Sequence, residues 1–462
     1  MFRSLRIQNF KAWRDTKEVR LAPLTVLFGT NSSGKTSLAQ MLLMLKQTAQ
    51  SPDRKRVLHP GDENTPVDLG TFHDMVFNHD LDSPIGFQLN MDLPAVLRVK
   101  DPKAGLSYHG DALTFEAEVG RDGGVGQPLA ARHLRYTLLR AGEPQLSVGM
   151  QPHEGKPGKY DLFAEPYTLV RAQGRKWLLP PPVRFYGFPD EAVAYYQNSG
   201  FVSDLSLALE KQLGDVHYLG PLREYPKRSY TWSGETPEHV GWRGERAIEA
   251  LLSGRERQLS AGYRKRARSF EEVVAEWLKR MGLIQEFVAR PIAEHRKEYE
   301  VLVKTARSSK SVNLTDVGFG VSQVLPVLVQ CLYAQPGSTI IFEQPEIHLH
   351  PRVQAALADF FIEVIHSREA GVDRKIQLIV ESHSEHFLRR IQRRVAETAL
   401  SRDEAALYFC EPGPRGASIR ELAVDEYGNI TNWPKDFFGD EVGDLAAMTE
   451  AAMKRQLGGG KR

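Results

Sequence analysis

The octapeptide at residues 29–36, Gly-Thr-Asn-Ser-Ser-Gly-Lys-Thr, constrains this chain more than any other feature. It satisfies the pattern G-x-x-x-x-G-K-[ST], and it lies between an apolar run at 24–28 and a segment of helical spacing that begins at Lys35. A strand, a glycine-rich loop and a helix in this order place backbone N–H groups and a helix N-terminus around an anion. The segment therefore predicts a phosphate-binding loop; the alternative is an ordinary glycine turn before a helix.

The residues of this loop have separate expected roles. The glycines let the backbone approach phosphate closely, Lys35 adds a positive charge, and the Thr36 hydroxyl can ligate magnesium. The sequence thus predicts ATP and Mg²⁺ as ligands. The predicted nucleotide-binding residues here are Gly29, Asn31, Ser32, Ser33, Gly34, Lys35, Thr36 and Ser37.

Chemically active residues also follow two apolar strands later in the chain. The run at 340–342 precedes Glu343, Gln344 and Glu346, and the run at 377–380 leads to His383. Acids at the carboxyl ends of parallel strands face the crevice in which α/β sheets bind ligands, so Glu343 is the predicted magnesium ligand beside Thr36. His383 is a candidate for a hydrogen bond to the γ-phosphate, with a purely structural histidine as the alternative.

The order of expected elements divides the chain into three parts. Alternating apolar strands and amphipathic helices at 1–64 and 305–410 predict a discontinuous α/β core with a mostly parallel sheet. Residues 65–304 predict an inserted β-rich and helical region, which includes a helix from 270 with a capping-box pair, Ser269 and Glu272. Residues 411–462 are expected to form a small C-terminal domain. The predicted fold class is an α/β P-loop NTPase.

Composition limits the possible partners and location. Sixty basic against 58 acidic residues leave a net charge of +2, so only a local patch could attract nucleic acid or membrane. Cys331 and Cys410 both lie in apolar runs, which argues against a disulfide framework. The N-terminus lacks the apolar core of a secretory signal, and the longest apolar stretch is about half the ~20 residues that span a bilayer. These features predict a soluble, cytoplasmic protein without a membrane contact.

Several segments resemble known ATPases. LRIQNFKAWRD and LTVLFGTNSSGKTSL look like the opening of RecF-like, SMC-like and OLD-type ATPases, and EQPEIHLHP and ESHSEHF resemble their Walker B and switch elements. With its C-terminal ELAVDEYGNITNWPKDFFGDE, nearly the whole chain is similar to a family of bacterial AAA/ABC-type ATPases that have a small C-terminal domain of unknown function.

This resemblance implies an ABC-type head that forms a homodimer around two ATP molecules. Residues 316–323 would stand at the signature, which caps the nucleotide of the opposite subunit, with Thr315, Gly318, Gly320 and Ser322 as candidate contacts. The segment departs from the usual serine-glycine-glycine pattern, so the contacting residue stays open. Taken alone, it could equally be a glycine turn before a core helix.

Gln344 bears on the predicted chemistry. Relatives usually carry a second carboxylate at this position, and an amide can orient water but cannot accept its proton. Hydrolysis is therefore expected to be slow, or to need help from Glu346 or His383. The candidate catalytic residues are Glu343, Gln344, Glu346 and His383.

The predicted function is that of a nucleotide-gated switch in bacterial anti-phage defence or DNA maintenance, with a protein effector encoded nearby. One alternative is a nucleotide-dependent binding module that hardly hydrolyses ATP. An OLD-type nuclease is a third possibility, although fewer than 80 residues follow His383, too few for an appended domain of about 100 residues.

Two other groups of residues have alternative interpretations. Histidines 348, 350, 383 and 386 could suggest zinc but lack a matched cysteine or acid at ligand spacing. Two basic clusters could contact DNA or RNA, or could be solvated faces. They consist of Arg389, Arg390, Arg393 and Arg394, and of Arg264, Lys265, Arg266 and Arg268.

Overall fold

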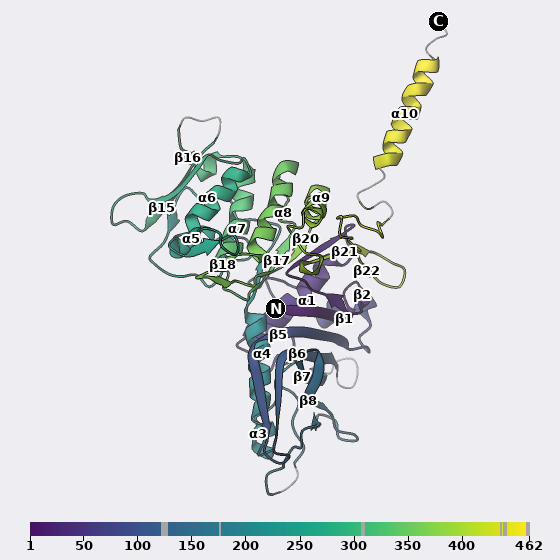
Figure 1. The fold of residues 1–462 in the computed structure, drawn as a ribbon. Coiled ribbons are helices and arrows are strands. Elements are labelled where there is room, and N and C mark those ends of the chain that lie inside the picture. Colours follow the sequence, from purple (N-terminus) through teal and green to yellow (C-terminus); the bar gives the residue numbers. More distant parts are fainter. Residues whose placement is uncertain (122–127, 175–176, 306–309, 435–436, 438–440, 459–462) are drawn as a thin grey trace.

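Two large sheets organise the computed structural model, which describes residues 1–121, 128–174, 177–305, 310–434, 437 and 441–458 (Figure 1). The first is six-stranded and runs in the order β10-β17-β20-β4-β21-β22, with the first five strands parallel. Its strands are β10 (Val216–Leu219), β17 (Thr339–Glu343), β20 (Gln377–Glu381), β4 (Leu24–Gly29), β21 (Ala405–Glu411) and the antiparallel β22 (Ser418–Glu421).

The strands of this parallel sheet are apolar on both sides, as expected for a sheet that is covered on both faces. In β17, Ile340 and Phe342 join one hydrophobic cluster, whereas Ile341 between them joins the other. This alternation places helices on both faces of the sheet. It also leaves the strand ends as the place where polar side chains can gather.

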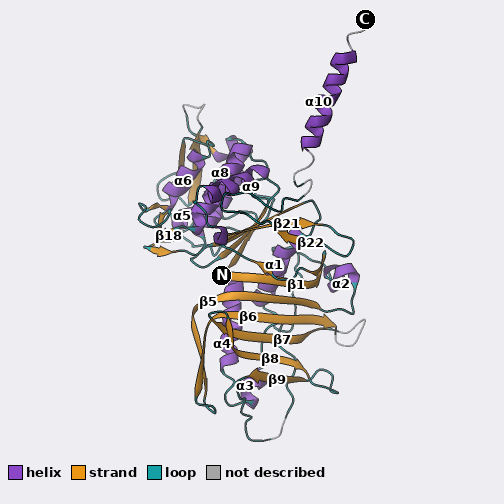
Figure 2. Ribbon diagram, turned by 45° about the vertical axis from the view of Figure 1, so that its right-hand side comes forward, coloured by secondary structure: helices purple, strands orange, loops and turns teal. Residues whose placement is uncertain are grey.

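The second sheet is antiparallel and has eight strands, shown as long orange arrows in Figure 2. Its strands are β1 (Phe2–Phe10), β2 (Trp13–Asp15), β3 (Val19–Arg20), β5 (Ile85–Asp101), β6 (Leu106–Arg121), β7 (Leu129–Arg140), β8 (Glu143–Pro152) and β9 (Tyr160–Glu165). Within β6, the alternate residues Leu113, Phe115, Ala117 and Val119 are buried, so one face of the strand lies in the core.

Helix α1 (Lys35–Gln50) lies between the two sheets. It contacts β1 of the antiparallel sheet and β4, β20 and β10 of the parallel one, and α4 (Phe201–Gly214) packs beside it. A helix covered on opposite sides must be apolar around most of its circumference. The run Met41, Leu42, Leu43, Met44 and Leu45 is accordingly buried throughout.

The remaining helices form a lobe on the other face of the parallel sheet. Within it, α5 (Ala247–Gly254) and α6 (Phe270–Arg280) pack on α7 (Phe319–Tyr333), and α8 (Pro351–Ile365) packs on α9 (Glu385–Ala396) and on β20 and β4. The Ser269–Glu272 capping box predicted for α6 is present.

Short elements complete the fold. One small sheet contains β11 (Tyr230–Thr231), β14 (Glu286–Pro291), β15 (Glu298–Lys304) and β16 (Val312–Asn313), and the other contains β12 (Gln258–Ser260), β13 (Arg268–Ser269), β18 (Arg368–Glu369) and β19 (Val372–Asp373). The short helices are α2 (Phe72–Met75) and α3 (Asp190–Tyr195), and α10 (Glu441–Gly458) projects away from the body in Figure 1. Within the described ranges, no helix combines the length and hydrophobicity required to cross a bilayer.

The sheets cut across the predicted domain boundaries. Strand β10, inside the region 65–304 predicted as an insertion, pairs with β17 of the parallel sheet, and β1 from the predicted core pairs with β5. The physical reason is that β10 has only four residues, two of them His217 and Tyr218, so it carries little of the apolar pattern that marks a buried strand.

We expect Arg374→Met to lower the free energy of unfolding by about 3 kcal/mol, because charge-assisted hydrogen bonds contribute about 1.5–3 kcal/mol each. The fully buried Arg374 guanidinium donates to the carbonyls of Cys331, Leu332 and Ala334 at the end of α7, at 3.2, 3.0 and 2.5 Å. Urea unfolding would measure the change. Arg290→Met removes an exposed ion pair to Glu300 and should cost at most about 1 kcal/mol; equal losses would contradict this account.

Candidate nucleotide site

The loop 29–36 joins β4 to α1, as predicted, and its two flanking glycines are required by close packing. Gly29 has a φ of 144°, and a Cβ atom on it would lie 2.2 Å from the carbonyl oxygen of Cys410. Gly34 has a φ of 87°, and a Cβ on it would lie 3.0 Å from the Trp13 indole, whose N–H donates to the Gly34 carbonyl at 3.0 Å. Any larger residue at either position would distort the loop.

Lys35 is the first residue of α1 and is buried under the loop. Its ammonium group donates to the carbonyl oxygens of Gly29 and Thr30, at 3.1 and 2.7 Å. Burial lowers the pKa of Lys35, and the nearby carboxylate of Glu381 opposes that shift. The loop therefore holds a lysine whose desolvation favours the approach of an anion.

The loop serines and Asn31 differ in exposure. Asn31 and Ser32 lie exposed at the rim, and Ser32 has a positive φ of 61°. Ser33 and Ser37 are buried. The exposed residues can contact a nucleotide through their side chains, whereas the buried ones support the backbone of the loop and the first turn of α1.

Thr36 faces a carboxylate that the sequence did not single out as a site residue. Its hydroxyl donates to Glu381 Oε2 at 2.8 Å, and Lys35 Nζ lies 4.0 Å from Glu381 Oε1. Glu381 ends β20, the strand next to β4. From β4 the chain continues to β10 on one side of the sheet, and from β20 it continues to β21 on the other side. Open α/β sheets bind their ligands at such a switch in direction.

Glu343, the predicted magnesium ligand, ends the next strand and lies in register with Glu381. Burial, followed by repulsion from Glu381, raises the pKa of Glu343 from its ordinary value of 4.5 to about 7. Burial also raises the pKa of Glu381, although Thr36 and Lys35 oppose this. Two neighbouring carboxylates are thus held where they resist ionisation unless a cation compensates them.

Two further residues beside Glu343 were missed at the sequence level. The Tyr218 hydroxyl hydrogen-bonds the Glu343 carboxylate, and burial raises the pKa of Tyr218. Arg223, which follows β10, is 9% exposed, and its two terminal guanidinium nitrogens have no hydrogen-bond partner among the described residues. The Arg223 pKa, lowered to about 10 by burial, still leaves it cationic at neutral pH near Glu343 and Glu346. Arg223 stands in LGPLREYPKRSY, whose prolines predict only a loop.

The turn after β17 links the strand ends. Gln344 has a φ of 44°, and its N–H donates to the Glu381 carbonyl at 2.9 Å. Glu346 is buried, and its Oε1 accepts hydrogen bonds from the Ser382 hydroxyl and the His383 N–H, at 2.8 and 2.7 Å. Among the described residues, the Gln344 side chain has no hydrogen-bond partner, which leaves its amide available to orient water.

His383 presents its side chain to solvent near the loop. Burial of part of the ring and the charge of Lys35 lower its pKa, so the neutral imidazole is favoured. The next residue, Ser384, caps α9 by accepting from the Phe387 N–H at 3.0 Å. His350 caps α8 through its Nδ1 in the same way. Within the described part of the chain, no group of three or more histidine, cysteine or acidic residues is arranged to hold a metal ion.

The predicted signature residues lie at the start of α7, in the helical lobe. Gly318 is the N-cap, Gly320 packs near Leu283, and the Ser322 hydroxyl donates to the Phe319 carbonyl. These contacts do not reach the loop 29–36 of the same chain. The structure therefore brings together the loop, Glu343, Gln344, Glu346 and His383, and it leaves the signature segment apart from them.

The α9 arginines are paired within the fold. Arg390 and Arg394 both bind Asp359 of α8, while Arg389 pairs with Glu385 and Arg393 with Glu397. In the other basic cluster, Arg268 pairs with Glu276. Arg389 and Arg393 are exposed but ion-paired, so residues 264–266 are the exposed members of the two clusters without an ion pair among the described residues.

The residues present fit a nucleotide with a divalent cation. A buried lysine and an arginine with unpaired N–H groups favour an anion, and two strand-end carboxylates beside a hydroxyl are the oxygen ligands that Mg²⁺ prefers. Together with the strand order, this arrangement defines a P-loop α/β fold.

Family comparisons agree with that class. Residues 1–104 match the model described as "AAA ATPase domain", residues 209–389 match "AAA domain, putative AbiEii toxin, Type IV TA system", and residues 400–448 match a protein family of unknown function, DUF3696. These matches support an AAA ATPase domain in the α/β part of this chain, followed by a segment similar to that uncharacterised family. The second match begins before β10, in line with the pairing of that strand with β17.

No curated protein matches the chain. Among solved structures, an SMC head bound to the C-terminal winged-helix domain of ScpA shares 10% identity at a TM-score of 0.46, over 92% of this chain and 98% of that one. An SMC head domain from Thermotoga maritima shares 11% at 0.40, over 92% and 99%. A Pyrococcus furiosus SMC head with an extended coiled coil, bound to the C-terminal domain of ScpA, shares 8% at 0.40, over 98% and 99%. At these scores and identities, the likeness supports no functional assignment.

We expect Glu343→Gln to change the pH dependence of stability in the absence of Mg²⁺ and nucleotide. A carboxyl whose pKa is raised in the folded state binds its proton more tightly there, so stability falls as the pH rises from 4.5 to about 7. Between pH 5 and pH 8, wild type should therefore lose on the order of 2 kcal/mol relative to the variant in urea unfolding. The exposed Glu256→Gln is the control and should parallel wild type; a parallel curve for Glu343→Gln would contradict the assignment.

Proposed function

We propose that this chain binds ATP with Mg²⁺ at the loop 29–36 and that two copies close over the bound nucleotides. The observation that carries the proposal is the hydrogen bond from Thr36 to Glu381, because it joins the loop to a strand-end carboxylate where the chain order of the sheet reverses. The AAA ATPase family matches support nucleotide binding in general.

Each residue has a defined part in binding. Lys35 would exchange the carbonyls of Gly29 and Thr30 for phosphate oxygens. Thr36 and Glu343 would hold Mg²⁺, with Glu381 as the neighbouring carboxylate. The ion would neutralise charge on the phosphates and on both carboxylates. Arg223 would supply a second fixed positive charge on the Glu343 side.

Hydrolysis in this site is expected to be slow. Gln344 can orient the attacking water but cannot take its proton. Glu346 is an alternative base, but one of its oxygens already binds Ser382 and His383, and burial raises its pKa. Neutral His383 can accept a proton or donate a hydrogen bond to the γ-phosphate. The nucleotide would thus stay bound long enough to act as a signal.

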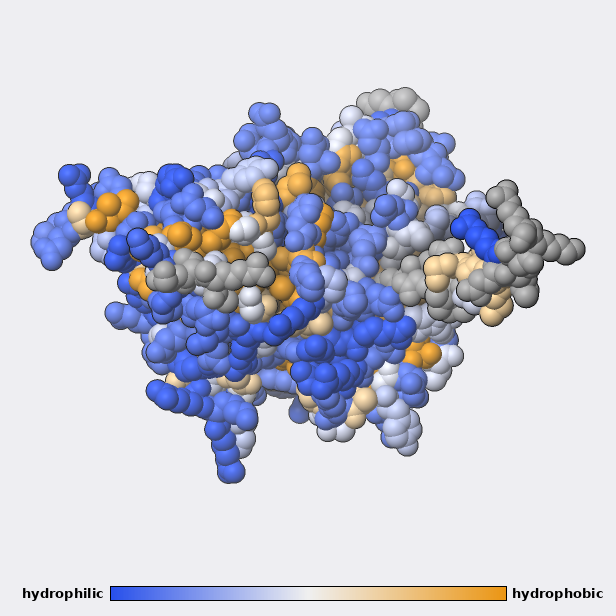
Figure 3. Space-filling model, turned by 90° about the horizontal axis from the view of Figure 1, so that it is seen from above, coloured by the Kyte–Doolittle hydropathy of each residue, from blue (hydrophilic) through white to orange (hydrophobic). Residues whose placement is uncertain are grey.

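Exposed apolar residues support closure by a second copy. Phe319, beside Gly318, is 61% exposed, and its ring lies 6.2 Å from that of Tyr225, which is 75% exposed. Leu222 in the same loop is 73% exposed. Large exposed apolar groups commonly mark protein interfaces, and Figure 3 shows apolar side chains in the middle of the face seen from above, bordered by hydrophilic ones. Gly318, Gly320 and Ser322 would then cap the nucleotide of the partner.

The cellular role is proposed from the predicted family resemblance and the description of the matched model. A dimer that forms when ATP binds and dissociates after hydrolysis could restrain or release a protein effector in anti-phage defence or DNA maintenance. Contact with DNA or RNA would fall to the exposed residues 264–266, because the α9 arginines are paired internally.

A nucleotide-dependent binding module that barely hydrolyses ATP is the second candidate, and Gln344 is the observation that favours it. An OLD-type nuclease finds less support. No observation in the described residues specifically favours it.

We expect ATP with Mg²⁺ to double the molar mass of the protein in solution, as measured by light scattering. Lys35→Ala should remain monomeric because it loses the positive charge that binds phosphate. The exposed Lys17→Ala should behave as wild type. Gly318→Trp should bind ATP but stay monomeric, since it places a large side chain on the proposed interface. An unchanged wild-type mass would contradict the dimer while leaving ATP binding intact.

We expect Gln344→Glu to raise the rate of phosphate release by about 10–100-fold, because a positioned general base typically contributes that much or more. The exposed Gln335→Glu is the matched control and should leave the rate unchanged. Wild-type release well above that of Lys35→Ala favours the enzyme, and release at that background favours the binding module. An unaltered rate in Gln344→Glu would contradict the role of residue 344.

A further inference from the structure

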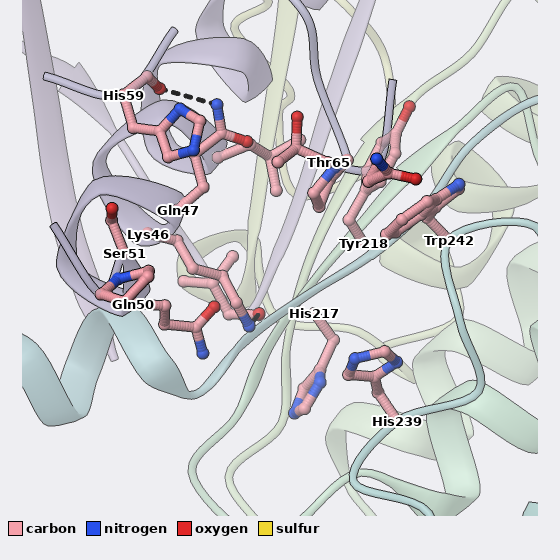
Figure 4. Close-up of a pocket in the computed structure, with 15 residues that line it drawn as sticks. Lys46, Gln47, Gln50, Ser51, His59, Thr65, His217, Tyr218, His239 and Trp242 are labelled. Carbon is pink, nitrogen blue, oxygen red and sulfur yellow. Dashed lines mark hydrogen bonds between the residues drawn. The ribbon is translucent and has the colours of Figure 1, made fainter. Parts of the chain in front are cut away.

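A pocket of about 290 Å³ lies between the C-terminal half of α1 and the edge strand β10 (Figure 4). Lys46 and Gln47 line it from α1, His217 and Tyr218 from β10, and His239 and Trp242 from the segment before α5. A helix rises about 1.5 Å per residue, so Lys46 is about 16 Å along α1 from Lys35. The pocket is therefore separate from the phosphate loop, and its volume is at the lower end of the about 300–1,000 Å³ of small-molecule sites.

Two buried polar atoms in this pocket lack a partner among the described residues. They are Oε1 of Gln47 and Nδ1 of His217, whose residues are 6% and 8% exposed. Nε2 of Gln47 already donates to the carbonyls of His59 and Val67, at 2.7 and 3.3 Å, and Nε2 of His217 lies 3.4 Å from the Ser338 hydroxyl. An unpaired buried polar group costs about 1–3 kcal/mol, so a molecule that pairs with both atoms would bind favourably.

The histidines offer neutral hydrogen-bonding edges. Burial, with the charge of Lys46, lowers the pKa of His217 to about 3, and burial also lowers that of His239. Nδ1 of His239 accepts from the Gly241 N–H at 3.0 Å, which leaves its proton on Nε2. Figure 4 shows Gln47 on one side of the pocket and the two histidines on another, so uncharged hydrogen-bonding groups lie on two of its walls.

The remaining walls favour a flat, uncharged ligand. Tyr218 and Trp242 add two further aromatic rings. No carboxylate is among the described residues that line the pocket. Lys46 is a positively charged side chain in the pocket wall, but its ammonium group already donates to the carbonyls of Gly214 and Val216. A cationic ligand would find no counter-charge, and a polyphosphate would find only this one partly committed lysine.

We propose that this pocket binds a neutral heteroaromatic molecule of nucleobase type, as a free base or a nucleoside, in addition to the ATP at the loop 29–36. A nucleobase has the flat ring that the aromatic walls accept and the adjacent donors and acceptors that Gln47 and His217 need. The Tyr218 side chain connects the pocket to the ATP site, because its hydroxyl binds Glu343. This connection rests on the proposed function, whereas binding itself does not.

Equilibrium dialysis of the full chain against adenosine, guanosine, cytidine and uridine tests the proposal, with ribose as the control that lacks a base. At least one nucleoside should bind at one site per chain, and ribose should not. Asn64→Trp, an exposed substitution at the pocket wall, should weaken nucleoside binding at least tenfold while ATP binding is unchanged. Gln47→Met, which removes the acceptor and keeps the volume, should weaken it as well.

Lys35→Ala distinguishes this proposal from the proposed function. That variant should lose ATP binding and keep nucleoside affinity within twofold of wild type. The proposal would be overturned if none of the four nucleosides binds, if Asn64→Trp binds as wild type does, or if Lys35→Ala abolishes nucleoside binding, because the last result would place the nucleoside in the ATP site.

Discussion

Electrostatic repulsion between two buried carboxylates is the constraint on which this site depends. Glu343 and Glu381 end adjacent parallel strands in register, and burial, followed by the repulsion that this pairing brings, raises the pKa of Glu343. Lys35 and Arg223 supply two positive charges nearby, but Glu346 adds a third carboxyl group. A divalent cation with a polyphosphate would neutralise these charges, because the cation would bind the carboxylates and the phosphates would bind the lysine and the arginine.

The loop after β10 connects this electrostatic centre to the surface proposed for a second copy. Arg223 lies near the carboxylates, and two residues further on Tyr225 packs against Phe319 at the start of α7. Arg228 then forms a bidentate ion pair with Asp316, at 3.2 and 2.8 Å. A short segment thus connects Arg223 with the start of the helix that carries Gly320.

The sequence predicted the elements whose signal is local. The loop 29–36 was identified from its own glycines and lysine, and the cap at Ser269 from its spacing to Glu272. The residues that were missed depend on contacts between distant segments. Glu381 faces Thr36 only because β20 pairs with β4. The place of β10 in the parallel sheet cannot be predicted from the residues around it, and the same holds for the ion pair between Arg390 and Asp359.

A crystal structure of the protein with Mg²⁺ and a non-hydrolysable ATP analogue tests the central claim most directly. The account predicts that the phosphates lie in the loop 29–36 and that Lys35 has moved from the carbonyls of Gly29 and Thr30 to a phosphate oxygen. Mg²⁺ should lie between the Thr36 hydroxyl and Glu343, beside Glu381. A nucleotide bound elsewhere, or a metal ion that touches neither strand-end carboxylate, would contradict it.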